Sequence, residues 1–248
     1  MNRQKVIITG ASQRIGLFLA GYLLSLEYDI IAVVRNPKRE LQALKALNKD
    51  RVTIVQKDFN DSKIDKAFWE SLINFNVVGF IHCASTFKYD TVDTTTDKVI
   101  KEQQNINCNV FIDACTSYCQ VKKQSEKEPM SFIAFLDAKL DRLNNDHYSY
   151  TLSKLQLQAS IPFLAMSCSP KARVNAISPG LVLRSGNQTE EEFKEAQKSL
   201  PFGFGVELED VAQTVAFLLM QNKTTGQIIT LDAGQHLQSD RDIIFRNQ

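Results

Sequence analysis

The succession of short β-rich runs and helical patterns is the feature that most constrains how this chain folds. The runs that predict strands are residues 6–9, 30–34, 52–55, 77–82, 131–136, 173–177 and 227–231. Several of them are apolar at consecutive positions, which is typical of strands buried on both faces. Because strands alternate with helices from one end to the other, the pattern predicts an α/β fold with a parallel sheet covered by helices.

Apolar residues between the strands recur at helical spacing and predict stripes that face the core. The clearest examples are Leu17, Ala20, Leu23 and Leu24 near the beginning, and Val211, Val215, Leu218 and Leu219 near the end. The 248 residues contain no internal repeat and no Gly/Ser linker, so we expect one domain over residues 1–248. A domain of this size buries roughly 70–75% of its unfolded surface and needs no disulfide or structural metal.

Charge and cysteine usage narrow the class of protein. The 29 basic and 28 acidic residues nearly cancel and form no like-charge run, which argues against a nucleic-acid partner. The five cysteines have no C-x-x-C spacing, so we expect reduced thiols and no metal site. The sequence has no signal-peptide pattern and no stretch of 18 apolar residues, which predicts a cytoplasmic protein without a membrane partner.

Two stretches interrupt the alternation of strands and helices. Residues 122–129 are charged and predict a solvated loop. Residues 181–205 carry Gly, Pro, Phe and a short acidic helical run, and a connection of this length is a candidate lid over a binding site.

A glycine turn follows the first predicted strand and precedes the first helix. It reads Thr9-Gly10-Ala11-Ser12-Gln13-Arg14-Ile15-Gly16. Gly10 adopts backbone angles that other residues avoid, and Gly16 lets the helix pack closely on the sheet. The amides at the start of such a helix point toward a phosphate, so the turn predicts a nucleotide site or, more simply, a tight connection.

Residues after the second and third strands indicate which nucleotide would bind. Arg35 follows the second strand, where a cofactor with a free ribose diol prefers an acid and a 2′-phosphate prefers an arginine. Arg35 therefore favours NADP(H), although a surface arginine is the simpler alternative. Asp58 follows the third strand as a candidate acceptor for the adenine amino group or as a turn-forming residue.

Tyr150 and Lys154 are four residues apart in a predicted helix, which places both side chains on one face. A unit charge about 4 Å away at an effective dielectric of about 20 is worth roughly 4 kcal/mol, or about three pKa units. We therefore expect Lys154 to lower the pKa of Tyr150 toward neutrality, where general acid catalysis is efficient.

Together these motifs resemble the short-chain dehydrogenase/reductase family over nearly the whole chain. The motifs are T-G-x-x-x-x-I-G at 9–16, Asp58, Asn109, Tyr150-x-x-x-Lys154, Ser178-Pro179-Gly180, and Thr225-Gly226-Gln227 through Asp232-Ala233-Gly234. The resemblance implies a single doubly wound Rossmann-type domain with a seven-stranded parallel sheet, a nicotinamide cofactor and a homotetramer. It implies that Tyr150 is the proton donor, that Lys154 binds ribose and that Asn109 supports a proton-relay water, with Asn107 as a close alternative.

Three positions depart from the usual family pattern. Arg14 replaces the middle glycine, Asp137 replaces the catalytic serine, and His82-Cys83-Ala84-Ser85 replaces Asn-Asn-Ala-Gly. These departures, with Phe87, resemble the pteridine reductases and the bacterial dihydromonapterin reductases. Cys83 in place of the second Asn has no explanation in the sequence.

The resemblance gives a full set of expected site residues. The expected catalytic residues are Tyr150, Lys154, Asp137 and Asn109. The expected NADP(H)-binding residues are Gly10, Ser12, Arg14, Ile15, Gly16, Arg35, Asp58, Ala84, Ser85, Tyr150, Lys154, Pro179 and Gly180. The expected substrate-binding residues are Arg14, Ser85, Phe87, Asp137 and Tyr150.

The leading hypothesis is an NADPH-dependent reductase of a dihydropterin, in which the flat heterocycle stacks on the Phe87 ring. A second hypothesis is a short-chain reductase of another carbonyl, such as a 3-ketoacyl thioester, because a fold alone does not define a substrate. A third is a catalytically silent NADP(H)-binding sensor, against which the intact Tyr150 and Lys154 pair argues.

Overall fold

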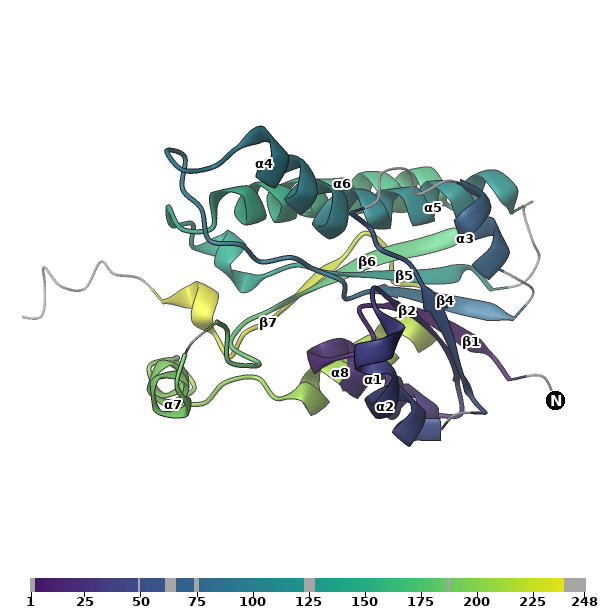
Figure 1. Cartoon of the computed structure of the whole chain (residues 1–248), viewed down its shortest axis with the longest axis horizontal. Coiled ribbons are helices and arrows are strands. Elements are labelled where there is room, and N and C mark those ends of the chain that lie inside the picture. Colours follow the sequence, from purple (N-terminus) through teal and green to yellow (C-terminus); the bar gives the residue numbers. More distant parts are fainter. Residues whose placement is uncertain are drawn as a thin grey trace, which may run out of the picture.

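The computed structural model describes residues 3–48, 50–60, 66–73, 76–122, 128–186 and 188–238. One parallel sheet runs through it in the order β3-β2-β1-β4-β5-β6-β7 (Figure 1). The strands are β1 (Lys5–Thr9), β2 (Asp29–Val34), β3 (Val52–Gln56), β4 (Val77–His82), β5 (Met130–Phe135), β6 (Ala172–Pro179) and β7 (Ile228–Leu231). All seven predicted strands and the doubly wound α/β fold class are therefore confirmed, with strand ends shifted by one or two residues.

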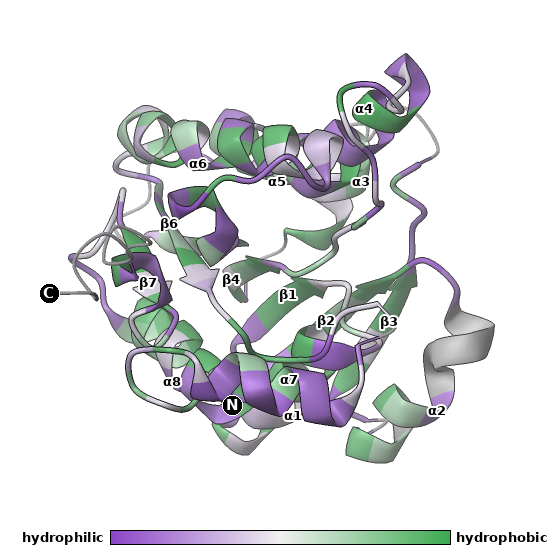
Figure 2. Ribbon diagram, turned by 90° about the vertical axis from the view of Figure 1, so that its left-hand side faces the viewer, coloured by the Kyte–Doolittle hydropathy of each residue, from purple (hydrophilic) through white to green (hydrophobic). Residues whose placement is uncertain are grey.

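Helices cover both faces of the sheet (Figures 1 and 2). The helices on one face are α1 (Arg14–Ser25), α2 (Pro37–Asn48) and α8 (Leu208–Met220). Those on the other face are α3 (Lys66–Leu72), α4 (Asp97–Gln104), α5 (Val110–Val121) and α6 (Tyr148–Cys168). Helix α7 (Glu190–Lys198) lies apart from both layers, toward the carboxyl ends of the strands (Figure 1).

Two apolar clusters pack on opposite faces of the sheet. Ile7 of β1 belongs to the cluster under α3 to α6, whereas its neighbours Val6 and Ile8 belong to the cluster under α1, α2 and α8. This alternation explains the consecutive apolar residues of the strand, because each one is buried against a different helical layer. Of the residues predicted to face the core, Leu17 is half-buried and the others are buried.

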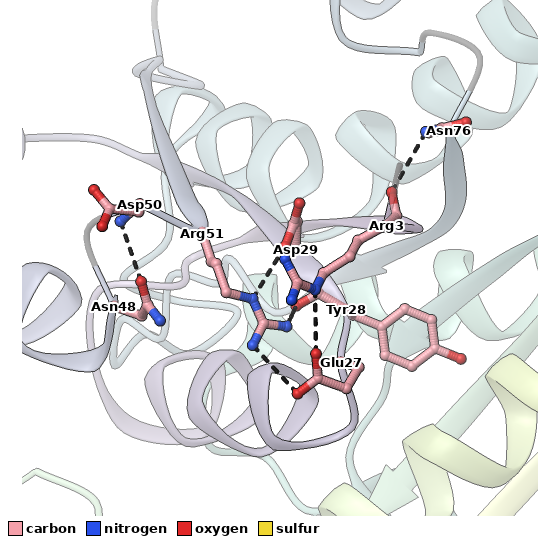
Figure 3. A network of polar contacts seen from close by, with 8 residues as sticks. All are labelled: Arg3, Glu27, Tyr28, Asp29, Asn48, Asp50, Arg51 and Asn76. Carbon is pink, nitrogen blue, oxygen red and sulfur yellow. Dashed lines mark hydrogen bonds and ion pairs between the residues drawn. The ribbon is translucent and has the colours of Figure 1, made fainter. Parts of the chain in front are cut away.

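Charged residues cluster at the amino ends of the strands (Figure 3). The Arg51 guanidinium lies 3.1 Å from Asp29 and 3.6 Å from Glu27, and Arg3 lies 3.1 Å from the same Glu27. These ion pairs join the starts of β1, β2 and β3. They lie at the amino-terminal edge of the sheet, whereas the glycine turn follows β1 at the carboxyl-terminal edge.

The remaining sequence predictions concern loops, cysteines and membranes. All five cysteines are free, as expected, with three buried and two half-buried. Residues 123–127 of the predicted charged loop lie outside the described residues. The predicted lid over 181–205 contains α7, whose N-terminus is closed by a capping box between Thr189 and Glu192. No helix among the described residues is long and apolar enough to cross a membrane.

Candidate active site

A cavity of about 1230 Å³ opens at the carboxyl ends of the strands. The strand order reverses between β1 and β4, and crevices at such reversals bind ligands in open α/β sheets. The predicted site residues that line the cavity are Gly10, Ser12, Arg14, Ile15, Gly16, Arg35, Asp58, Ala84, Ser85, Phe87, Asp137, Tyr150, Lys154, Pro179 and Gly180. Of the predicted site residues, only Asn109 does not line the cavity.

The glycine turn is closely packed against the loop after β4. Gly10 has a φ of +67°, and a Cβ there would lie 2.8 Å from the Cα of Ala84. A Cβ on Gly16 would lie 2.2 Å from the Gly10 carbonyl oxygen. Both positions therefore require glycine, and the backbone comes close enough to the cavity for a phosphate to approach the first amides of α1.

Arg14 begins α1 in a left-handed conformation, with a φ of 51°. This is the conformation that the glycine usual in the family adopts freely, and for a side-chain-bearing residue it costs about 1–2 kcal/mol. The guanidinium reaches across the cavity mouth, where Nη2 donates to the Arg184 carbonyl at 2.8 Å. Arg14 therefore links the turn to the segment before α7, and its other donors remain available for a ligand.

A chain of buried hydrogen bonds fixes the backbone of Ala84. The Ala84 amide donates to Thr9 Oγ1 at 3.1 Å, Thr9 Oγ1 lies 2.8 Å from His82 Nδ1, and His82 Nε2 lies 2.9 Å from the Ile106 carbonyl. A carbonyl only accepts, so Nε2 carries the proton and Nδ1 accepts from Thr9. Burial lowers the pKa of His82 to about 3, which keeps the ring neutral and this direction of donation fixed.

The second unusual residue of that loop, Cys83, donates its amide to the Thr9 carbonyl at 3.2 Å. Burial raises the pKa of its thiol, so the sulfur stays protonated beside the charged Lys154. Cys83 is thus an uncharged part of the cavity wall. The Cys83 amide extends the pairing of β4 with β1 without any contribution from its side chain.

Tyr150, Asp137 and Lys154 form the polar centre of the cavity. The Tyr150 hydroxyl donates to Asp137 Oδ2 at 2.8 Å, and Asp137 Oδ1 accepts from the Lys139 amide at 2.8 Å. Lys154 Nζ donates to the Phe135 carbonyl at 2.7 Å. Tyr150 and Lys154 do share one helix face, as predicted, and both side chains are buried.

The expected lowering of the Tyr150 pKa is wrong for this structure. Burial and the adjacent Asp137 carboxylate raise the pKa of the phenol well above 10.0. Lys154 does not offset this, because its ammonium lies 5.7 Å from the ring centroid and is bound to a carbonyl. Burial also lowers the pKa of Lys154 to about 8, although Asp137 acts in the opposite direction. The phenol is therefore firmly protonated at neutral pH.

Neither Asn107 nor Asn109 lines the cavity, but Asn107 bonds to the loop after β4 that does. Residues Asn105–Asn109 form the π-helical turn η1 before α5. Its geometry buries Asn107, whose Oδ1 accepts from the Ser85 hydroxyl at 3.1 Å and from the Thr86 amide at 2.8 Å. Its Nδ2 donates to Ser153 Oγ at 2.9 Å, which ties the loop after β4 to α6. Sequence motifs could not decide between two asparagines so close together, because the register depends on this π-turn.

Phe87 is half-exposed beside Tyr150, with the two ring centroids 4.7 Å apart and nearly perpendicular. One face of its ring is covered by His147, which stacks on it with centroids 3.7 Å apart. His147 has a φ of 54° at the start of α6, and its Nδ1 lies 3.0 Å from the Lys88 carbonyl. No role for His147 was predicted from the sequence, yet its ring supports Phe87 in the wall of the cavity.

Arg35 and Asp58 line the nucleotide end of the cavity. Asp58 Oδ1 accepts from the Asn60 amide at 2.9 Å, so this residue does form a turn. The two readings of Asp58 are compatible, because its second carboxylate oxygen remains an acceptor. No metal-binding group of three or more His, Cys, Asp or Glu exists in the part of the chain that the structure describes.

A comparison with protein families assigns this architecture. A family model described as enoyl-(acyl carrier protein) reductase matches residues 10–236. The chain belongs to the short-chain dehydrogenase/reductase family. The chain is therefore an oxidoreductase, and the family uses NAD(P) as its cofactor.

Relatives within the short-chain dehydrogenase/reductase family share nearly the full length of the chain. A dihydromonapterin reductase of Enterobacter sp. (strain 638) is 26% identical over 239 residues, covering 95% of this chain and 98% of the relative. That of Citrobacter koseri is 24% identical over 235 residues, covering 94% and 97%. The crystal structure of FolM alternative dihydrofolate reductase 1 from Brucella canis, complexed with NADP, is 25% identical, covers 97% of both chains and has a TM-score of 0.86. The Brucella suis protein, also in complex with NADP, has a TM-score of 0.87 at 25% identity, with 96% of each chain covered.

Proposed function

We propose that this chain is an NADPH-dependent reductase of dihydropterins of the dihydromonapterin or pteridine type. The observation that carries the proposal is the hydrogen bond from Tyr150 to Asp137, in a cavity that Arg14, Ser85 and Phe87 also line. The general pattern of the short-chain dehydrogenase/reductase family has a serine in place of Asp137. The similarity to dihydromonapterin reductases and to NADP-bound FolM proteins supports the same substrate class and cofactor.

The nucleotide end of the cavity fits NADP(H). Because Gly10 and Gly16 carry no side chain, a phosphate could approach the backbone at the start of α1. Arg35 would supply a cation for a 2′-phosphate. Lys154, from the floor of the cavity, would bind the nicotinamide ribose. When bound, NADPH supplies the hydride.

The residues of the chain manage the proton. Tyr150 is protonated at neutral pH, as a proton donor must be, but its raised pKa makes it a weaker acid than an ordinary tyrosine. Asp137 accepts the hydroxyl hydrogen bond and orients the phenol toward the cavity. When Tyr150 gives its proton to the substrate, the Lys154 ammonium, 5.7 Å from the ring centroid, attracts the phenolate only weakly.

The substrate end of the cavity suits a flat, polar heterocycle. Phe87, half-exposed and lining the cavity, offers an aromatic contact for the heterocycle, worth about 0.5–1.5 kcal/mol beyond area burial. The planar donors of Arg14 and the Ser85 hydroxyl would bind the polar edge of the ring. Residues 181–205 would contact the substituent at the far end of the heterocycle.

NADPH oxidation by the purified protein tests the proposal. Quinonoid dihydropterin, dihydromonapterin, dihydrofolate and an acetoacetyl thioester are offered in parallel, and the loss of nicotinamide absorbance is followed. We expect oxidation with the pterins. Oxidation with the thioester alone would mean that this is a reductase of another carbonyl, and tight NADPH binding without any turnover would mean a silent sensor.

Variants connect that activity to the site. Tyr150→Phe is expected to lower kcat by about 10²–10⁴-fold with NADPH affinity unchanged, because only the proton donor is removed. Phe87→Ala is expected to raise KM for pterins. Tyr148→Phe, the same change two residues earlier in α6, is the matched control and should retain full activity. Unchanged turnover in Tyr150→Phe would reject the proton-donor role.

We also propose that the protein is a homotetramer. Helix α8 exposes the large apolar side chains Phe217 and Met220, which favours contact with another subunit. Sedimentation velocity of the purified protein tests this, and a monomer at micromolar concentration would reject it.

A further inference from the structure

The first turn of α6, which carries Tyr150 as its third residue, is capped by a residue from a distant loop. The first amides of a helix have no partner within the helix and need acceptors outside it. His147, which precedes α6, makes no side-chain capping bond and has a φ of 54°. The acceptors come instead from Asp90, in the loop after β4.

Asp90 bonds to α6 through both its backbone and its side chain. Its carbonyl accepts from the Tyr148 amide at 3.0 Å, and its Oδ1 accepts from the Ser149 amide at 3.0 Å. Its Oδ2 accepts from the Ser149 hydroxyl, and Ser149 Oγ lies 2.8 Å from Thr95 Oγ1. A helix is usually capped by the side chain of its own N-cap residue, whereas Asp90 lies 59 positions before Ser149.

The Asp90 carboxylate is buried, with only 4% of the residue exposed. Burial raises the pKa of this carboxyl, but hydrogen bonds from Ser149 and Thr95 more than offset that effect, and the pKa lies below its ordinary value. A negative charge at the N-terminus of a helix also interacts favourably with the helix dipole. The cap is therefore an anion at neutral pH, held by hydrogen bonds to both of its oxygens.

The loop that carries Asp90 also forms part of the cavity wall. Phe87 lines the cavity, and its ring centroid lies 4.7 Å from that of Tyr150. His147 stacks on Phe87, and its Nδ1 lies 3.0 Å from the Lys88 carbonyl. Together with the bonds of Asp90, these contacts join the loop to the residues directly before Tyr150.

We propose that Asp90 is a positioning residue, which holds the Tyr150 hydroxyl in place for proton transfer by capping α6. The inference rests on the proposed function, in which Tyr150 is the proton donor. Asp90 does not line the cavity, so it acts through the backbone of α6 and not on the substrate. A displacement of a reacting group by about 1 Å can cost about 100-fold in rate. Loss of the cap should therefore lower kcat and leave binding nearly unchanged.

Two substitutions of Asp90 test the role of its carboxylate. Asp90→Ala removes both oxygens, whereas Asp90→Asn keeps an oxygen for the Ser149 amide. With the substrate that the wild type reduces, we expect kcat to fall by about 10–100-fold in Asp90→Ala. Its KM, and its NADPH affinity measured by fluorescence, should change little. Asp90→Asn should recover most of the turnover.

Two further variants make the kinetic result specific. Asp93→Ala removes an exposed carboxylate from the same loop and is the matched control, which should behave as the wild type. Ser149→Ala removes only the hydroxyl bond to Asp90 and keeps the amide bond. It should lower kcat in the same direction as Asp90→Ala but less, and it serves as the test if Asp90→Ala does not fold.

Hydrogen exchange supplies a readout that does not depend on turnover. Amide exchange is followed by mass spectrometry on peptides that cover the first turn of α6. In Asp90→Ala this turn should exchange faster than in the wild type, while the rest of α6 stays protected. Asp90→Asn should exchange nearly as the wild type does.

The outcomes separate this inference from the proposed function. A wild type that reduces the thioester and not the pterins would reject the proposed substrate, and the kcat of Asp90→Ala with the thioester would still test positioning. A wild type without any turnover would reject both. Positioning alone is overturned if the wild type is active and Asp90→Ala keeps its kcat, loses activity only through KM, or exchanges faster throughout the protein.

Discussion

The hydroxyl of Tyr150 lies 2.8 Å from Oδ2 of Asp137 and donates to it. This contact pairs the proton donor with an anion at the position where a neutral serine is usual in the family. Burial is the larger cause of the raised phenol pKa, and this contact adds to it, since the carboxylate disfavours the phenolate both by its charge and by accepting the hydroxyl hydrogen bond.

Asp137→Asn tests the role of that charge. The amide oxygen still accepts from Tyr150, but the anion is gone, so the pKa of the phenol should fall toward its ordinary value. We expect kcat for pterin reduction to fall by about 10²–10⁴-fold if Asp137 participates in proton transfer, with little change in KM. An ultraviolet pH titration of the variant, compared with that of the wild type, measures the pKa of the phenol. Asp137→Ser supplies the usual family residue as a second variant, and full pterin turnover in it would contradict a specific need for the carboxylate.

Arg14→Gly should separate backbone strain from side-chain function. Glycine adopts the φ of 51° freely, whereas Arg14→Ala keeps the strain and also removes the guanidinium. The glycine variant should therefore be more stable than the alanine variant by about 1 kcal/mol. Both should show a raised KM for pterin. Chemical unfolding and steady-state kinetics give the two readouts, and equal stabilities would mean that the turn is unstrained.

Asn107→Ala and Asn109→Ala form a matched pair of substitutions within η1. Asn107→Ala removes the acceptor of the Thr86 amide, and a buried group left without a partner costs about 1–3 kcal/mol. It should also loosen Ser85 and reduce activity. Asn109→Ala should change stability by no more than about 0.5 kcal/mol and leave turnover intact. The reverse order of effects would restore Asn109 as the functional asparagine.

His82 predicts a specific acid sensitivity. Its pKa is about 3 in the folded protein and 6.5 when exposed, so between these values the unfolded chain binds a proton that the folded chain does not. The free energy of unfolding should therefore fall as the pH falls from 6.5 toward 3, by about 1.4 kcal/mol per pH unit from this group. The stability difference between wild type and His82→Asn, measured by urea unfolding across this range, should shrink accordingly. A pH-independent difference would mean that His82 is not held neutral.

The fold was predictable because its signals are local and repeated. Each strand is an apolar run, and Gly10 and Gly16 mark a turn where a Cβ has no space. Arg14, Ser85, Phe87 and Asp137 were predictable from motif positions, and the structure brings them to one cavity.

The site details that failed depend on geometry that spacing does not contain. The expected effect of Lys154 on Tyr150 assumed a charge about 4 Å away, but the ammonium binds the Phe135 carbonyl instead. The choice of Asn109 over Asn107 rested on motif position, which does not show that Asn107 in the π-turn bonds to Ser85. The contact of His147 with Phe87 was not predicted because it joins two loops distant in the sequence.

The hydrogen bonds from Ala84 through Thr9 to His82 join residues that are 75 and 73 positions apart. During synthesis, the first strand, turn and helix leave the ribosome long before β4 exists to complete them. The turn therefore reaches its final shape only after the centre of the sheet has assembled, since such long-range contacts form late and slowly. A truncated chain that ends before β4 would carry the whole glycine motif and still lack a finished nucleotide cradle.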